Sequence, residues 1–254
     1  MPNWCHNTLT VLGGSAAEVQ RFVTAAQPTE ALARDHYPAE CVVPFDEFLT
    51  DFRASQPLMF AALVPEPSQE QYAEMDEAAK TTCRLCGGRG KRPVTAAEAA
   101  DWGCDFHPGV NELSFDQRPA CSVCAGSGRA IPGGSDAWYR WRLTHWGCKW
   151  EPQFSRPATA VATPGAGADI GLSTAARGRT DAEAAAVYRF DTPSSPPIPF
   201  IAHATEMFPA LDFLLAYGEP GIGFAGRLRC RGGELIDHET LDIDDALPAE
   251  DMWF

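Results

Sequence analysis

The sequence predicts an α+β protein that is interrupted by an inserted zinc-binding segment. Three observations lead to this prediction. The chain opens with an alternating strand pattern that runs straight into an amphipathic helix, and strand and helix patterns resume after residue 187. Between these regions lie two copies of the pattern Cys-x-x-Cys-x-Gly-x-Gly, which is typical of a metal site and not of a hydrophobic core.

The first strand and helix are predicted from residues 2–26. Apolar and polar residues alternate over 2–12, and Gly13-Gly14 ends the strand. Ser15 and Glu18 form a capping-box pattern, in which each side chain satisfies a free amide of the other residue. The helix that follows has an apolar face with helical spacing and ends before Pro28; that face consists of Val19, Phe22, Val23 and Ala26.

The middle of the chain is less regular. Apolar residues in 28–58 are expected to be buried, in part along one short helix, and residues 69–79 form a polar helix that leads into the cysteine segment. Ser135-Asp136 can cap a helix that ends at Gly147, and residues 149–154 have an extended pattern.

The second half of the chain repeats the strand and helix succession. Residues 156–180 are predicted as a hairpin or loop, 187–190 as a strand, 198–208 as a helix that starts near Pro199, and 213–217 as a buried strand. Residues 224–231 and 234–237 read as a hairpin around Gly232-Gly233.

Without the cysteine segment, the order is strand, helix, strand, strand, helix, strand, which is the ferredoxin-like βαββαβ arrangement. We therefore predict a discontinuous host domain from residues 1–79 and 133–238, a zinc-ribbon or zinc-knuckle insertion at 80–132, and an acidic tail at 239–254.

The two cysteine motifs predict one structural Zn²⁺. A Cys-x-x-Cys turn points two thiolates at one centre, so two turns supply the four ligands of a closed tetrahedral site. The alternative is four free or buried thiols. Cys104 and His107 could form a second, partial site, but two ligands do not complete a tetrahedron. The predicted zinc ligands are Cys83, Cys86, Cys121 and Cys124.

Composition limits the classes of partner. The 254 residues carry a net charge of -14 and a pI near 4.8, which disfavours bulk duplex DNA and anionic membranes as partners. Nine cysteines, four of them metal thiolates, suit a reducing compartment, and there is no signal peptide or membrane-spanning run. We therefore expect a cytoplasmic protein.

Seven short segments of the chain carry a family resemblance. They are residues 1–7 (MPNWCHN), 63–67 (LVPEP), 145–150 (HWGCKW), 190–197 (FDTPSSPP), 208–211 (FPAL), 217–221 (YGEPG) and 224–226 (FAG). In this order they resemble the YubB-like or Api-like proteins of phages and plasmids, although His145 and Cys148 stand where that family usually has Asn and Thr. The resemblance implies a ferredoxin-like domain and a mobile-element setting, but no activity.

The cysteine turns also resemble half of the cysteine-rich region of DnaJ-type chaperones. No J-domain signature accompanies them, so chaperone activity does not follow.

Two groups of residues are candidates for binding a partner. The aromatic and basic residues that interleave after residue 137 could stack unpaired bases, although the tryptophans could equally be core residues. A basic run in the insertion could form a contact surface, or it could be a solvated face. The candidates are Trp138, Trp141, His145, Trp146, Lys149 and Trp150 in the first group, and Arg84, Arg89, Lys91 and Arg92 in the second.

No catalytic residue is predicted, because the chain has no P-loop, dinucleotide fingerprint or His-Glu-x-x-His motif. The expected function is that of a phage or mobile-element accessory protein that binds a host or phage protein, or a short structured RNA, through the zinc module. The alternatives are an acidic mimic of nucleic acid, and an enzyme whose site is not visible in one sequence.

Overall fold

The computed structural model describes residues 3–13, 15–91, 120–131, 134, 136–154, 159–162 and 184–243. The chain divides into two compact units, Met1–Glu66 with Tyr139–Phe254, and Pro67–Trp138. The predicted insertion at 80–132 falls within the second unit, which also contains helix α5 (Gln69–Ala79). We describe each unit by itself.

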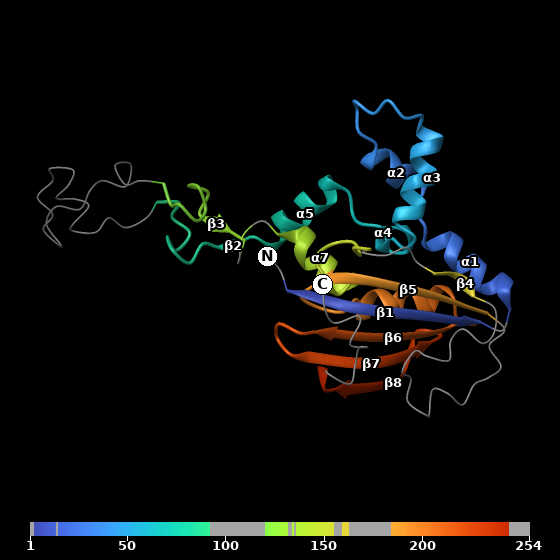
Figure 1. The fold of residues 1–254 in the computed structure, drawn as a ribbon. Helices are drawn as coiled ribbons and strands as arrows, with labels where there is room; N and C mark the ends of the chain where they lie inside the picture. The colour runs from blue at the N-terminus through green and yellow to red at the C-terminus, as the bar shows by residue number, and fades with distance from the viewer. Residues whose placement is uncertain are drawn as a thin grey trace, which may run out of the picture. The chain divides into compact units, whose positions relative to one another are not determined.

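The first unit is built on a six-stranded antiparallel sheet in the order β4-β5-β1-β6-β7-β8 (Figure 1). The elements β1, α1, β4, β5, α8 and β6 occur in this order in the chain, with further elements between α1 and β4. Their four strands lie side by side, which confirms the ferredoxin-like prediction. Strands β7 and β8 extend the sheet beyond β6. The strands are β1 (Trp4–Gly13), β4 (Thr159–Ala162), β5 (Ala184–Pro193), β6 (Asp212–Glu219), β7 (Phe224–Arg231) and β8 (Glu234–Leu241).

Strand β1 is the centre of the sheet, because it pairs with β5 on one side and with β6 on the other. Leu9 lies opposite Tyr188 of β5 and Leu215 of β6, so the three side chains share one face of the sheet. All three are buried in the same core. The alternating pattern of the opening residues therefore identified the buried face correctly.

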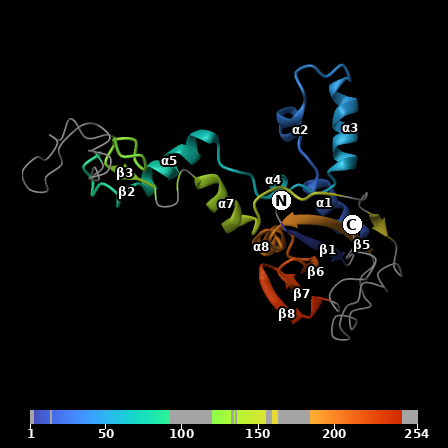
Figure 2. The ribbon, with the colours of Figure 1, turned by 60° about the vertical axis from the view of Figure 1, so that its left-hand side comes forward.

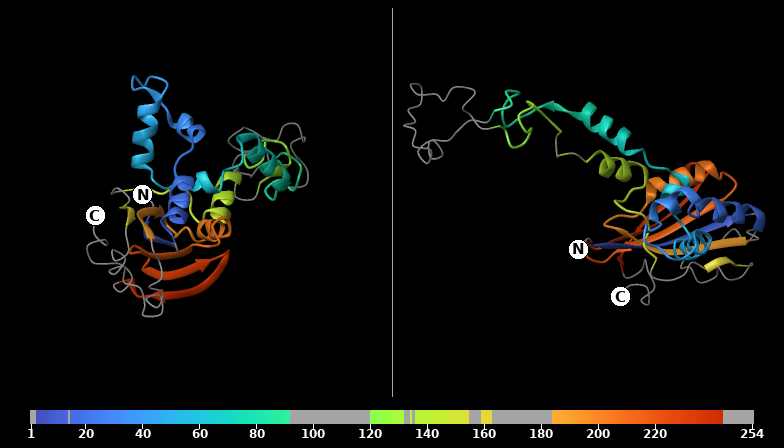
Figure 3. Two further views of the ribbon diagram at one scale, coloured as in Figure 1. Left: turned by 90° about the vertical axis from the view of Figure 1, so that its right-hand side faces the viewer. Right: turned by 90° about the horizontal axis from the view of Figure 1, so that it is seen from above.

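Helices α1 (Ala16–Ala26) and α8 (Ile198–Met207) supply much of the other half of this core (Figure 3). The Ser15 hydroxyl caps α1 by accepting a hydrogen bond from the Glu18 amide at 3.2 Å. Phe22 is fully buried, and its ring makes edge contacts with Tyr188 and Phe213. Each of the two crossovers of the fold thus buries an apolar helical face against the sheet.

A helical pair, α2 (Glu30–His36) and α3 (Phe45–Ser55), follows α1, and its helices lie side by side (Figure 2). The pair is held by ring contacts. Tyr37 packs edge-on against Phe48, whose ring stacks on Phe52 at a centroid distance of 5.5 Å. The expected short helix in residues 28–58 is therefore α3, and α2 was not predicted.

The segment around α4 (Phe60–Leu63) is joined to α7 (Ala137–His145) through Trp146 and Arg142. Trp146 is fully buried, and its Nε1 donates a hydrogen bond to the Val64 carbonyl at 3.0 Å. The Arg142 guanidinium donates to both carboxylate oxygens of Glu66, at 2.7 and 2.9 Å, and lies 5.1 Å from the Trp146 ring. This geometry makes Trp146 a core residue.

Two predicted boundaries were wrong. The second strand of the fold is β4, within the segment predicted as a hairpin or loop, whereas residues 149–154 contribute only a single bridge between Gln153 and Asp191. The acidic tail was expected from residue 239, but β8 continues to Leu241. The acidic residues of β8 are paired in register with arginines of β7: Glu234 with Arg231, Asp237 with Arg229, and Glu239 with Arg227.

Residues 244–254 of the predicted tail lie outside the described residues. Within the described part of the chain, no helix has both the length and the apolarity to cross a lipid bilayer.

A carboxyl group fixes the start of α4. Glu151 accepts hydrogen bonds from the Phe60 and Ala61 amides, at 2.6 and 2.9 Å, through separate oxygens. Desolvation outweighs these two bonds and raises the pKa of Glu151 from 4.5 to about 7. The folded protein therefore holds this proton more tightly than the unfolded chain does. The resulting stabilisation is present below pH 4.5 and is lost as the pH rises through 7.

We predict that Glu151→Gln separates the contribution of the two hydrogen bonds from that of the titration. The variant cannot titrate, and its NH₂ group faces an amide donor, so it should unfold more easily than the wild type by about 2 kcal/mol. The gap in unfolding free energy should widen by roughly 1–2 kcal/mol between pH 8 and pH 5. Urea denaturation of both proteins at both pH values measures this difference in unfolding free energy. Any effect of pH on the cysteine cluster is common to the wild type and the variant, and it cancels in the difference. If the unfolding free energies of the two proteins changed in parallel with pH, the raised pKa of Glu151 would be contradicted.

Candidate metal centre

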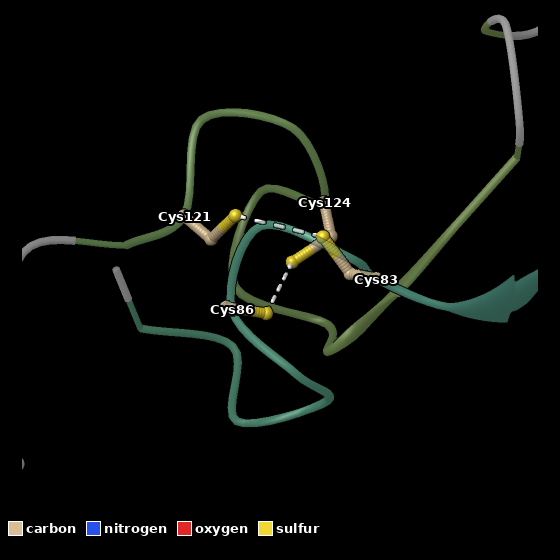
Figure 4. A group of neighbouring side chains, drawn as sticks. All are labelled: Cys83, Cys86, Cys121 and Cys124. Atoms are coloured by element: carbon tan, nitrogen blue, oxygen red, sulfur yellow. Dashed lines mark hydrogen bonds between the residues drawn. The ribbon is translucent and has the colours of Figure 1, made fainter. Parts of the chain in front are cut away.

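Four cysteines of the second unit bring their sulfur atoms together in one compact cluster (Figure 4). Two chain turns supply them, each flanked by one strand of a small ladder formed by β2 (Thr81–Thr82) and β3 (Arg129–Ala130). All four Sγ atoms lie within 4.8 Å of one another and are buried; Cys83–Cys121 and Cys86–Cys124 are 3.7 and 3.8 Å apart. Zn–S bonds of about 2.3 Å in a tetrahedron require sulfur separations of about 3.8 Å. The donor set thus fits a thiolate-bound metal ion.

The two turns repeat each other at a sequence offset of 38 residues. The Cys83 amide donates to the Gly128 carbonyl at 2.9 Å, and the Cys121 amide donates to the Gly90 carbonyl at the same distance. The flanking pairs, Thr82 with Arg129 and Lys91 with Ala120, are also related by this offset. The motif copies are therefore two halves of one approximately two-fold symmetric module.

Backbone amides stabilise one thiolate in each half. The Gly90 amide donates to Cys86 Sγ and the Gly128 amide donates to Cys124 Sγ, both at 3.3 Å. Burial raises the pKa of Cys124, but the amides of Gly128 and Gly126 and the neighbouring thiols outweigh it and bring the pKa to about 7. Such amide–sulfur bonds favour the ionised form that binds metal.

The last glycine of each motif is required by the packing of one half against the other. Gly90 and Gly128 have φ values of +74° and +75°, and a Cβ on either would lie 2.2 Å from a backbone oxygen of the opposite turn. Gly87 differs, because a Cβ there meets nothing within 4 Å. Its equivalent in the second half is Ala125, which already adopts a φ of +47°. The two halves therefore approach too closely for any side chain at Gly90 or Gly128.

We predict opposite outcomes for two alanine substitutions in the same turn. Gly90→Ala should displace the opposite turn and cost more than about 3 kcal/mol of module stability. Gly87→Ala should cost only about 1–2 kcal/mol, the penalty of a left-handed alanine without a steric clash, which Ala125 already tolerates in the other half. Competition for metal between each purified variant and a chelator measures the difference. Equal metal retention in the two variants would show that the glycine contact is not needed.

The basic candidates lie in the same module. Arg84 and Arg89 are exposed and Lys91 is half-buried, whereas Arg92, Cys104 and His107 lie outside the described residues. Trp138 falls in the second unit as well. Charge in the described parts of the module is of one sign, since residues 80–91 and 120–131 contain five Lys or Arg and no Asp or Glu.

The remaining aromatic candidates belong to the first unit and have different surroundings. Trp146 offers no free ring face, because it is fully buried. Trp141 stacks on His145 at a centroid distance of 4.3 Å, and Lys149 Nζ lies 4.6 Å from the Trp150 ring. The candidates thus do not form one continuous stacking platform.

Some neighbours of these candidates were not expected from the sequence. His203 of α8 continues the Trp141–His145 stack at 6.0 Å, a contact between residues far apart in the chain. Leu85 and Val123 are exposed at the third position of their Cys-x-x-Cys turns. Both motif copies carry an aliphatic residue at this third position, and this repetition in the sequence could have indicated the exposed pair.

Comparison with known proteins places the similarity in the C-terminal part of the chain. Residues 175–252 match a family model described as the ferredoxin-like domain in Api92-like protein. The crystal structure of protein Api92 from Yersinia pseudotuberculosis aligns over 95% of this chain and 98% of that chain, with 14% identity and a TM-score of 0.39. No curated protein matches the chain. The region that forms β5, α8, β6, β7 and β8 is therefore similar to the ferredoxin-like domain of Api92-like proteins.

Proposed function

We propose that the cysteine cluster holds one structural Zn²⁺ and that the protein acts by binding, with the zinc module as its contact surface. The observation that carries this proposal is the set of four buried sulfurs within 4.8 Å of one another, two pairs of which have the separation of a tetrahedral zinc site. A site with four thiolates leaves no coordination position for water or substrate, so the metal would stabilise structure and not catalyse a reaction. The family resemblance suggests a phage or mobile-element accessory protein, whose partner is a protein or a short structured RNA of host or phage.

The charge distribution supports binding through the module. The thiolates and Zn²⁺ together contribute a charge of about −2. The insertion at 80–132 carries seven Lys or Arg and five Asp or Glu, so with the metal site it is about neutral. Its two cysteine turns, residues 80–91 and 120–131, carry five of these cations and no carboxylate. The rest of the chain is strongly acidic, which disfavours long polyanions such as duplex DNA.

The acidic-mimic alternative receives less support from the first unit. A mimic of nucleic acid needs rows of uncompensated carboxylates, whereas the acidic residues of β8 face arginines of β7. Two of these arginines, Arg229 and Arg231, form salt bridges with Asp212 of β6, at 2.9 and 3.8 Å. The carboxylates of β8 thus lie beside a strand that carries cations and do not form an isolated acidic row.

Cys5, the cysteine next to His6, does not support the enzyme alternative. Cys5 is fully buried, and desolvation, followed by the nearby Glu219 charge, raises its pKa to about 12. A thiol with this pKa is almost entirely protonated at neutral pH and is a poor nucleophile. His6 instead contacts Asp191 at 2.7 Å.

Metal analysis tests the zinc assignment. Purified protein should contain one zinc per chain, and Cys86→Ser should lose it and unfold the module, because structural zinc contributes on the order of 10 kcal/mol. Cys41→Ser is the matched control, since Cys41 is a partly buried thiol far from the cluster in sequence and outside it. Well under one zinc per chain in the wild type, or full retention in Cys86→Ser, would contradict the assignment.

Charge reversal tests the contact surface. Arg84→Glu with Arg89→Glu should abolish capture of the partner from host lysate while zinc content and the melting curve stay unchanged. Each single reversal, Arg84→Glu or Arg89→Glu, changes the net charge by −2, and Arg21→Glu, an exposed substitution on α1 with the same change, is the control for the single variants. Identification of the retained molecules by mass spectrometry and by RNA sequencing distinguishes protein from RNA. Tight binding to random duplex DNA with a steep salt dependence would refute the proposed role.

A further inference from the structure

The zinc module exposes an apolar residue from each of its two turns. Leu85 and Val123 are 49% and 59% exposed, and they are equivalent under the 38-residue offset that relates the turns. Each follows the first cysteine of its turn by two positions, so the cluster fixes the backbone on both sides of it. Leu85 and Val123 directly precede Cys86 and Cys124, whose sulfurs are 3.8 Å apart, so both aliphatic residues lie beside the cluster. Exposed apolar side chains that gather in one place mark surfaces that bury them on binding.

Positive charge accompanies these two residues. Arg84 is next to Leu85 in the chain and is exposed, as is Arg89 in the same turn. The corresponding positions of the second turn are Ser122 and Ser127, which are exposed and uncharged. We call Arg84, Leu85, Arg89 and Val123 the knuckle surface.

The chemistry of this surface discriminates between protein and RNA. Recognition of unpaired bases relies on aromatic side chains on which the bases stack. Residues 80–91 and 120–131 contain no Phe, Tyr, Trp or His, so the described parts of the module offer no stacking platform. Aliphatic side chains beside arginines instead complement a polypeptide that alternates apolar and acidic residues.

We propose that the knuckle surface binds an acidic protein segment that carries aliphatic side chains. The segment places its apolar residues on Leu85 and Val123 and its carboxylates on Arg84 and Arg89. This inference rests on the proposed function, because the turns keep their shape only when the metal is bound.

The test uses the full chain and a fluorescent peptide of repeated Glu-Leu-Asp-Ala units, with anisotropy as the readout. The peptide should bind, and Leu85→Ser with Val123→Ser should weaken binding at least about tenfold without changing zinc content. The control is Ile222→Ser, which changes an aliphatic residue that is 65% exposed in the first unit and should have no effect. A peptide of repeated Glu-Ser-Asp-Ser units, which keeps the charge and lacks leucine, should bind at least about tenfold more weakly.

Other outcomes overturn the inference. Binding of single-stranded oligouridine more tightly than the peptide would assign the surface to RNA. Wild-type affinity in the serine variants would show that the aliphatic residues do not contact the partner. If zinc is present at one per chain and the peptide does not bind, only this inference fails; if zinc is absent, the proposed function fails with it.

Discussion

The pairing of β1 with β5 is the constraint on which the first unit depends. The two strands are matched over their whole length, and Asn7 reaches across them to donate a hydrogen bond to Thr192, 185 positions later in the chain. The entropy cost of closing a loop grows only slowly with its length, by about 0.6 kcal/mol for each doubling. The chain between these strands can therefore accommodate α2, α3 and a complete second unit without weakening the sheet much. What must be kept is the register, since a slip of one residue would turn Leu9 and Tyr188 away from the core.

The second unit is stabilised in a different way from the first. Its cysteine cluster is packed by only one partly buried apolar neighbour among the described residues, Ala130. A module with so little apolar burial needs another source of cohesion, and metal ligation is a common one in small domains. The close backbone contact through Gly90 and Gly128 is a consequence, because the ligands must converge from both halves. The exposed third positions of the turns are then available for contacts with a partner.

Local patterns in the sequence were sufficient for the elements that carry their own signal. The strand that became β1, the cap at Ser15, the hairpin at Gly232-Gly233 and the clustering of the four cysteines all followed from spacing or turn chemistry. β4 could not be predicted, because it is short and depends on pairing with β5. The end of β8 was missed because its acidic residues suggested a tail, and only the register with β7 shows their partners. Trp146 stayed ambiguous because its hydrogen-bond acceptor, Val64, lies 82 positions earlier.

The division of the four cysteines between two turns has a consequence for biosynthesis. Each turn supplies only two thiols, so the proposed four-thiolate site is complete only after Cys124 has been added to the growing chain. At that stage β5, β6, β7 and β8 have not been made, and β1 has no partner strand. Translation proceeds at about 5–20 residues per second, so several seconds separate the completion of the metal site from that of the sheet. With the proposed zinc bound, the cysteine module can therefore mature on the ribosome while the sheet of the first unit is still incomplete.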